Sequence, residues 1–287
     1  MGNEKKPPPL SPVAQEIGTV AANFALGFAR PFYWHRGALN ENRNMRGGTA
    51  FVLKFGERYI GVTANHVMEE YLAAKREDSN LICQMQMGRV EPEKNIIAQS
   101  EALDLATFSI NPILVPTFHG ETMDCTGKWP PPAVKRGDAL SAAGYPENLR
   151  SEIEQGHFEF GAWGALCIAD DVTERSILTI YDPKQIAMSP KWALLKPPLG
   201  INLSGCSGGP VILHHAVGRI QMFSPVGIIV TGPTGVAPEQ PESDDRAKLG
   251  ELASDDRIFF RRLDLMREDG TLKEPNMGWT PPPSRVF

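Results

Sequence analysis

Glycine and proline divide this chain into short segments. Its 287 residues include 27 Gly and 25 Pro, and short β-branched or alternating runs lie between them. Both residues interrupt regular structure and mark turns, so such runs favour short strands over long helices. The sequence therefore predicts an all-β fold, and its length provides ample core for independent folding.

The clearest predicted element is a hairpin in residues 49–64, TAFVLKFGERYIGVTA. Phe51, Leu53 and Phe55 lie at alternate positions, and Gly56 with Glu57 can form the turn. A short helix is expected directly afterwards, in HVMEEYLAAK (66–75). Further strands are expected to begin at Leu81, Leu105, Asp138, Ser176, Pro210 and Pro225.

A change of composition separates these strands into two sets. Residues 113–133 are rich in Pro, Gly and Thr, which is typical of a linker. Two sets of roughly five or six strands of similar length favour two small packed barrels over one sandwich. We therefore expect an N-terminal extension over 1–45, a six-stranded antiparallel β-barrel over 46–118, a linker over 119–135 and a second such barrel over 136–236.

The remaining segment, 237–287, is expected to contain an acidic loop, a C-terminal helix and a Pro-rich tail. Phe259, Leu263 and Met266 lie at helical spacing. Ser254 can cap the N-terminus of this helix, and Gly270 can end it.

Charge and cysteine usage exclude several classes of function. The net charge is −5 and no stripe of Lys and Arg is present, which argues against a nucleic-acid partner. The four cysteines are widely separated and lack the spacing of a zinc site. Two disulfides are an open alternative, although reduced thiols are the preferred interpretation. No metal, nucleotide or redox cofactor is implied.

An apolar run near the N-terminus, residues 17–29, invites interpretation as a signal peptide. Pro7–Pro9 and Glu16 interrupt the order of regions that a signal peptide needs, and the run is too short to span a bilayer. An amphipathic helix that packs on the main domain is the preferred interpretation. We therefore expect a cytoplasmic protein with no membrane partner.

The six residues GCSGGP, 205–210, carry little that a core can use. Their value lies in backbone shape or in the hydroxyl of Ser207. Negative charge that develops on an attacked carbonyl is stabilised by two backbone N–H groups, and Gly205 permits the backbone conformation this needs. A Gly-rich surface turn is the alternative interpretation.

A serine that attacks carbonyls needs a base and an acid that orients the base. Among six histidines, His66 stands at the end of a predicted strand, where a rigid sheet can support an imidazole that reaches a cleft. A partly buried, hydrogen-bonded structural histidine is the alternative. Asp104, directly before an apolar strand, is the candidate acid; Glu101 is its rival, and a simple strand-entry aspartate is the structural alternative.

Three motifs in this order, GTAFV with TANHV, then LDLATF, then SGCSGGPV, closely resemble the catalytic signatures of trypsin-like (chymotrypsin-fold) serine peptidases. VTANHV and GDALSAAGYP are similar to bacterial Do/HtrA-like members. The resemblance covers about residues 47–232, and no PDZ-like domain fits in the 55 residues after Gly232. It implies a chymotrypsin-like pair of barrels.

The resemblance also implies a role for each matching residue. Ser207 attacks, His66 acts as general base and then acid, and Asp104 orients His66. The N–H groups of Gly205 and Ser207 form the oxyanion hole. The substrate-binding positions it implies are Ile201 at the base of the primary pocket and Val230, Thr231 and Gly232 beside the substrate backbone.

The expected function is a serine endopeptidase that cleaves polypeptides through an acyl-enzyme intermediate. Cys206 is a less favoured nucleophile because its thiol lies one position early. A catalytically silent trypsin-fold module that binds peptides or partner proteins is the alternative. So is an autoinhibited enzyme whose termini cover the cleft until a regulatory protein partner or cleavage frees it.

Overall fold

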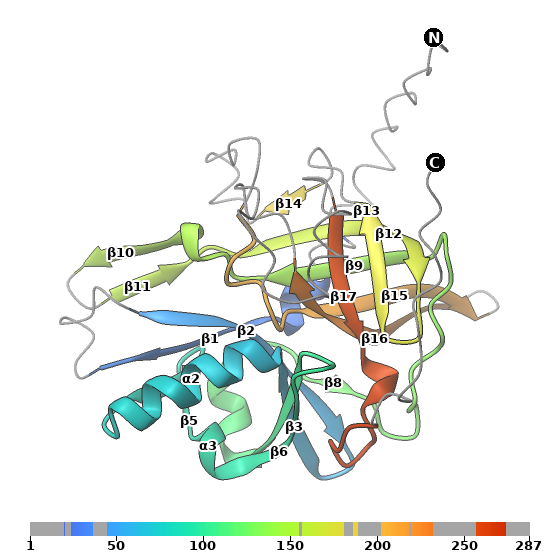
Figure 1. Ribbon diagram of the computed structural model, residues 1–287. Helices are drawn as coiled ribbons and strands as arrows, with labels where there is room; N and C mark the ends of the chain where they lie inside the picture. The colour runs from blue at the N-terminus through green and yellow to red at the C-terminus, as the bar shows by residue number, and fades with distance from the viewer. Residues whose placement is uncertain are drawn as a thin grey trace.

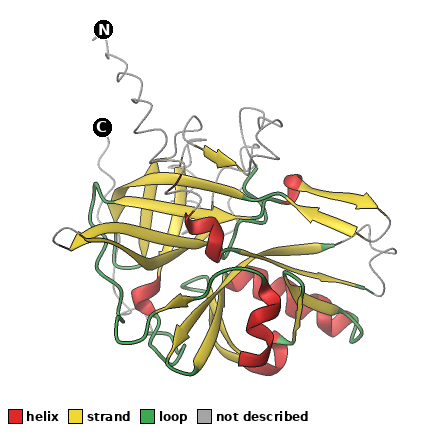
Figure 2. Ribbon diagram, turned by 180° about the vertical axis from the view of Figure 1, so that it is seen from behind, coloured by secondary structure: helices red, strands yellow, loops and turns green. Residues whose placement is uncertain are grey.

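The computed structural model describes residues 20, 24–36, 45–154, 157–180, 186–188, 202–217, 220–231 and 257–273. Strands dominate these residues and form two packed halves, with few helices (Figure 1). Seen from the opposite side, the helices are short and most lie beside the first half (Figure 2). The predicted all-β class with two barrel-like halves is confirmed and is consistent with a chymotrypsin-like fold.

The first half is a curled, open sheet in the strand order β5-β4-β1-β2-β3-β7-β6, with β8 paired to β2. The predicted hairpin forms β2 and β3, in which Phe51 pairs with Val62. The strands are β1 (Arg30–His35), β2 (Arg46–Phe55), β3 (Arg58–Thr63), β4 (Ile82–Met85), β5 (Gly88–Val90), β6 (Ile96–Ser100), β7 (Leu105–Ile110) and β8 (Met123–Asp124).

The second half is a closed barrel of six strands. Its strands follow the order β13-β17-β16-β15-β9-β12, and a pairing between β12 and β13 closes the ring. β14 (Ile186–Met188) adds to β12, and β10 (Arg150–Glu154) pairs with β11 (His157–Phe160) as a separate hairpin. The barrel strands are β9 (Ala139–Gly144), β12 (Trp163–Val172), β13 (Ser176–Ile180), β15 (Pro210–Val217), β16 (Ile220–Thr231) and β17 (Arg257–Arg262).

Three strands lie outside the ranges expected for the barrels. β8 falls in the expected linker 119–135, yet it pairs with β2. β1 falls in the expected extension 1–45, yet it pairs with β2 and β4. β17 falls in the expected segment 237–287, yet it pairs with β13 and β16 and completes the barrel. Each half therefore takes a strand from the sequence that flanks its predicted range.

The predicted C-terminal helix is wrong. Phe259 lies in β17, and a short 3-10 turn, η5 (Leu263–Leu265), follows. Ile258 and Phe260 face the barrel interior, whereas Phe259 faces the cluster between the two halves. A strand buried on both faces has no alternation to read, so the helical spacing was coincidental.

Few helices accompany the sheets. The expected helix after the hairpin is α2 (Asn65–Glu77), and α3 (Pro92–Asn95) forms a single turn. Two further 3-10 segments, η2 (Pro112–Phe118) and η3 (Glu147–Leu149), lie between strands. Residues 24–28 of the expected N-terminal helix are helical and pack on the second half, where Phe24 stacks on Phe223 at 4.1 Å.

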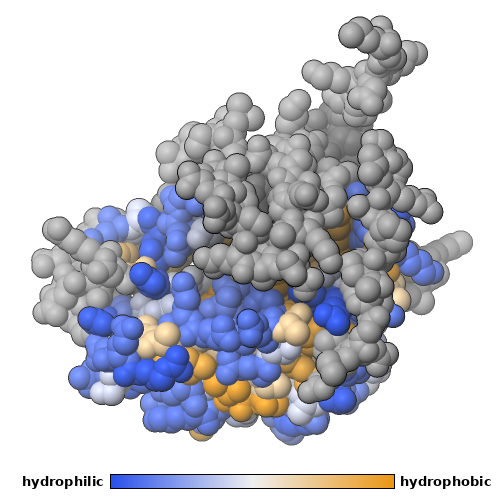
Figure 3. All heavy atoms as spheres, in the orientation of Figure 1, coloured by the Kyte–Doolittle hydropathy of each residue, from blue (hydrophilic) through white to orange (hydrophobic). Residues whose placement is uncertain are grey.

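The larger apolar cluster joins the two halves. It contains the core of the first sheet together with side chains of the second half, among them Ile212, Ile228 and Phe259. On the face drawn in Figure 3 the described surface is largely hydrophilic, and apolar side chains gather near its lower edge, in the region of β6. Within the described ranges, no helix has both the length and the apolar character needed to cross a membrane.

Replacing Phe260 with Ala tests the assignment of β17 to the barrel. This ring is fully buried, so its loss is expected to lower the free energy of unfolding by about 3–5 kcal/mol. Met87→Ala is the control, because Met87 is 71% exposed and its loss should change stability by less than about 0.5 kcal/mol. Chemical denaturation measures both, and equal stabilities of the two variants would contradict the assignment.

Candidate active site

His66 lies in the first turn of α2, where backbone N–H groups lack partners within the helix. Ala64 occupies the N-cap position and has no side-chain acceptor. Oδ1 of Asp104 accepts the N–H of His66 at 2.9 Å instead. The carboxylate thereby caps the helix, and its negative charge favours the N-terminal end of the helix dipole.

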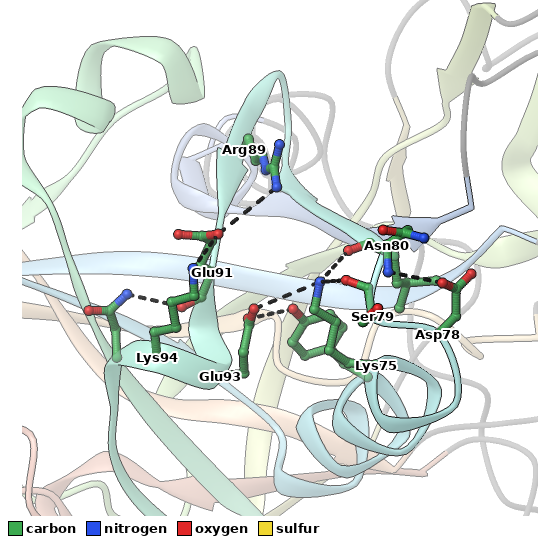
Figure 4. A network of polar contacts seen from close by, with 11 residues as sticks. Lys75, Asp78, Ser79, Asn80, Arg89, Glu91, Glu93 and Lys94 are labelled. Carbon is green, nitrogen blue, oxygen red and sulfur yellow. Dashed lines mark hydrogen bonds and ion pairs between the residues drawn. The ribbon is translucent and has the colours of Figure 1, made fainter.

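The other end of α2 is fixed by a network of polar contacts (Figure 4). Nζ of Lys75 donates to the carbonyls of Ser79 at 2.8 Å and Leu81 at 2.7 Å. The hydroxyl of Tyr71 donates to Glu93 at 2.5 Å. Burial, followed by the contacts with Cys83 and Glu93, raises the pKa of Tyr71, so it stays a neutral donor. The helix that carries His66 is therefore fixed by hydrogen bonds to loops and to α3, which lie next to strands of the sheet.

The ring of His66 binds the same carboxylate that caps its helix. Nδ1 lies 2.8 Å from Oδ2 and 3.0 Å from Oδ1 of Asp104. An ionised carboxylate only accepts hydrogen bonds, so Nδ1 must carry the proton. In the neutral ring Nε2 is then an acceptor. This is the tautomer that a general base for a serine requires.

Asp104 is suited to remain ionised. Burial alone raises the pKa of its carboxyl, but the hydrogen bond and charge of His66, the backbone N–H of His66 and the charge of Arg261 outweigh burial and lower it. The backbone of Asp104 adopts φ +46°, a left-handed conformation that Asp tolerates better than most residues. Glu101, the rival acid, is exposed. Geometry therefore favours Asp104 over Glu101.

Two consecutive backbone turns meet at Cys206, and Ser207 is the second residue of the later turn. In the first turn, the N–H of Cys206 donates to the carbonyl of Leu203 at 2.9 Å, and Gly205 has φ +92°. In the second, the N–H of Gly209 donates to the carbonyl of Cys206 at 2.9 Å, and Gly208 has φ +86°. A positive φ at the third position is what a type II turn requires, so glycine is needed at both places.

Every carbonyl around Ser207 accepts a hydrogen bond, either within these turns or from another segment. Within the described part of the chain, the N–H groups of Gly205 and Ser207 donate to no acceptor. Each carbonyl from Leu203 to Ser207 accepts a bond, in order from Cys206 N–H (2.9 Å), Glu147 N–H (2.8 Å), the Thr49 hydroxyl (2.7 Å), Gly209 N–H (2.9 Å) and Thr49 N–H (2.9 Å). Because the two unused N–H groups flank the turn that carries Ser207, they can serve as donors to an oxyanion.

Cys206 is buried beneath this turn. Its side chain is fully inaccessible, and burial raises the pKa of its thiol well above the usual value. The thiolate is the nucleophilic form of cysteine, so Cys206 is a poor nucleophile. The space beside it exists because residue 144 is Gly, where a Cβ would lie 2.8 Å from Cβ of Cys206.

One cleft of about 1260 Å³ brings the candidate residues together. His66, Gly205 and Ser207 all line it, and Glu70 with Arg150 contributes charges of both signs to its wall. Among the described groups, no hydrogen bond joins Nε2 of His66 to Oγ of Ser207. Such bonds are commonly long without substrate and shorten when it binds.

The predicted substrate-binding residues lie partly within the described chain. The end of β16 is tied to the turn at Ile229, whose carbonyl accepts Gly208 N–H at 2.7 Å and whose N–H donates to Gly209 at 2.9 Å. Val230 follows, nearly buried, and the exposed Thr231 comes after it. Ile201 and Gly232 lie outside the described residues.

Other histidines have different partners. His35 Nε2 lies 2.8 Å from the amide of Gln84, and His215 Nε2 lies 3.0 Å from the hydroxyl of Ser224. His214 Nε2 lies 2.7 Å from the hydroxyl of Ser141. Ser141 is a buried residue in the middle of β9, and burial lowers the pKa of His214. The His214–Ser141 pair is thus a part-buried contact between the neighbouring barrel strands β15 and β9.

The sequence prediction missed Thr49 and Glu147, which bind the carbonyls of the Ser207 turn from two other segments. Thr49 stands inside GTAFV, which was interpreted as a strand and as part of the family resemblance without a role for Thr49 itself, and Glu147 follows the predicted strand at Asp138. A buried threonine in a strand carries no signal of its own, because threonine is common in strands.

Comparisons with known proteins add little at the sequence level. No protein-family model matches the chain. A search of curated proteins also finds no match.

Solved structures give weak matches. The scabies mite inactivated protease paralogue S-I1 has a TM-score of 0.40 and 11% identity, covering 84% of this chain and 90% of that one. Protease Anisep from Arthrobacter nicotinovorans has a TM-score of 0.40 and 11% identity, covering 82% and 90%. The serine endoprotease from Yersinia pestis has a TM-score of 0.38 and 15% identity, covering 79% and 59%.

Replacing Asp104 with Asn is expected to lower the free energy of unfolding at neutral pH and to lose this effect in acid. The folded-state pKa of Asp104 lies below the unfolded value of about 3.9, so the unfolded chain binds the proton more tightly. The carboxylate therefore stabilises the fold above about pH 4, and this contribution disappears as the pH falls through the lower, folded-state pKa.

Urea denaturation of the wild type and of Asp104→Asn, at neutral pH and at about pH 3 and below, measures this effect. Glu101→Gln is the matched control, since it removes an exposed carboxyl of the same turn. A stability difference for Asp104→Asn that stays constant on acidification would contradict the inferred pKa shift.

Proposed function

We propose that the protein is a serine endopeptidase that hydrolyses peptide bonds through Ser207, His66 and Asp104. The observation that carries this proposal is a combination in one cleft. The His66 ring, oriented by a carboxylate, faces the same space as a serine whose turn leaves two N–H groups unbound. A structural histidine or a surface turn would not require either feature.

In the proposed reaction, Oγ of Ser207 bonds to the substrate carbonyl carbon while its proton passes to Nε2 of His66. Negative charge develops on the carbonyl oxygen, where the N–H groups of Gly205 and Ser207 donate to it. Asp104 stabilises the imidazolium that forms. Removal of one such N–H donor typically costs about 10²–10³ in rate, so this pair is a large part of catalysis.

Collapse of the tetrahedral intermediate breaks the carbon–nitrogen bond, and His66 gives its proton to the leaving amine. Water then attacks the acyl-enzyme, losing a proton to His66, and the acid product leaves as Ser207 regains its proton. Val230 and Thr231 follow the point where β16 joins the nucleophile turn, which supports pairing of their backbone with an extended substrate. Resemblance to the bacterial Do/HtrA-like type supports the same kind of polypeptide substrate.

Cysteine usage supports the proposed cytoplasmic location. All four cysteines are free and buried, as suits a compartment that keeps thiols reduced.

A fluorophosphonate probe tests the nucleophile directly, with the adduct located by mass. Wild type is expected to react at Ser207, and Ser207→Ala is expected to abolish labelling. His66→Ala should slow labelling by about 10²- to 10⁴-fold, the usual contribution of a general base. Ser141→Ala is the matched control, because it removes the hydroxyl of another histidine–serine pair, His214–Ser141, and should leave labelling unchanged.

Three further results would decide against the proposal. Labelling that is lost in Cys206→Ala but kept in Ser207→Ala would identify the Cys206 thiol as the nucleophile. A wild type that never reacts would favour the alternative of a silent or autoinhibited module that binds peptides. If the labelled enzyme releases no fragments from casein, the hydrolase is not a general endopeptidase.

A further inference from the structure

We propose that Thr49 is a positioning residue for the oxyanion donors, acting from the first half of the molecule on the turn of the second. This inference rests on the proposed function and names a residue that acts through the turn, not on the substrate. Thr49 lies in β2 and is fully buried, so its hydroxyl is available only to protein groups.

The Thr49 hydroxyl acts both as acceptor and as donor of a hydrogen bond. It accepts the N–H of Tyr145 at 3.0 Å and donates to the carbonyl of Gly205 at 2.7 Å. Because a backbone N–H can only donate, its bond to Oγ1 requires a lone pair of the hydroxyl, and the hydroxyl proton is then directed to Gly205. The backbone N–H of Thr49 also donates to the carbonyl of Ser207 at 2.9 Å.

These bonds fix two peptide planes of the turn. The carbonyl of Gly205 and the N–H of Cys206 belong to one plane, and that N–H closes the turn to Leu203. If this plane rotates, the bond from Cys206 N–H to Leu203 that closes the turn is lost. The preceding plane, which carries the N–H of Gly205, then keeps only the bond from Glu147 N–H to the Ser204 carbonyl. A rotated plane would also direct the Gly205 carbonyl, a negative dipole, towards the place where the oxyanion develops.

Removal of the hydroxyl leaves two part-buried groups without this partner, the carbonyl of Gly205 and the N–H of Tyr145. Unpaired buried polar groups are costly, and rotation of the Gly205–Cys206 plane towards the cleft is a direct way to relieve the cost. We therefore expect loss of the hydroxyl to reduce reactivity at Ser207 while the rest of the fold persists. Valine is the informative replacement, because it keeps the shape of threonine and its backbone N–H.

The test measures the second-order rate of labelling of the full chain by an alkyl fluorophosphonate. In this step the Oγ–phosphorus bond of Ser207 forms, the phosphorus–fluorine bond breaks, fluoride leaves and the serine proton passes to His66. The phosphonyl oxygen occupies the position of the oxyanion. Thr49→Val is expected to slow labelling by about 10- to 100-fold, and Thr49→Ser is expected to restore most of the rate.

Thr107→Val is the matched control. Thr107 is an equally buried threonine of the same sheet, and its hydroxyl donates to the carbonyl of Gly270 at 2.7 Å. It should label at the wild-type rate, with any loss of stability recorded as a lower melting temperature. Equal slowing of Thr107→Val and Thr49→Val would overturn the proposal, since the effect would then be general destabilisation.

A second pair keeps the test decisive if Thr49→Val does not fold. Thr49→Ala and Thr49→Ser both lose the methyl group and differ only in the hydroxyl, so equal labelling rates would overturn the proposal. If the wild type is labelled and Thr49→Val is labelled at the same rate, the role of Thr49 is overturned while the proposed function stands. Absence of labelling in the wild type would overturn the proposed function, and this inference with it.

Discussion

A peptide plane presents its carbonyl oxygen and its N–H on opposite sides, so a bond to one fixes the direction of the other. Around Ser207 this constraint determines the site. All five carbonyls from Leu203 to Ser207 are bound, and the N–H groups of Gly205 and Ser207 are left without an acceptor in the described chain. In the proposed function these two N–H groups act as oxyanion donors, and they would be oriented before a substrate binds, as backbone groups that stabilise developing charge without reorganisation must be.

The constraint operates across the two halves of the molecule. The turn that carries Ser207 belongs to the half that contains the closed barrel. His66 and Asp104 belong to the half that contains the open sheet and α2. Thr49 lies in the sheet, and its hydrogen bonds to Gly205 and Ser207 connect the sheet to the turn. The apolar cluster that includes Ile212, Ile228 and Phe259 packs the two halves together. The site geometry therefore depends on packing between halves more than on either half alone.

Local signals in the sequence were sufficient for some features. The alternation of Phe51, Leu53 and Phe55 predicted the β2–β3 hairpin, and the motif around His66 predicted α2. The approach of His66 to Asp104 was predicted from motif order, and the structure brings the two side chains together at 2.8 Å. The roles of these residues remain predictions, because geometry alone measures no reactivity.

Other features could not be predicted because their causes lie far apart in the chain. Phe259 and Phe260 face two different apolar environments, which hides the strand period of β17. Thr49 bonds to residue 205, and nothing near Thr49 in sequence indicates that contact. Asp104 was the candidate acid and Glu101 its rival. The structure separates them, because the turn between them places Asp104 against the helix and leaves Glu101 exposed.

Asp104 also explains why α2 can begin without a side-chain cap. Its carboxylate accepts the N–H and the ring of the same residue, His66, so the position of the helix end and the orientation of the imidazole are coupled. A side-chain acceptor at residue 64 would bind the free N–H groups at the start of the helix. The Asp104 carboxylate would then bind only the ring of His66. Because Ala64 provides no such group, the same two oxygens must serve both purposes. The carboxylate that caps the helix therefore also fixes the tautomer and the direction of the His66 ring.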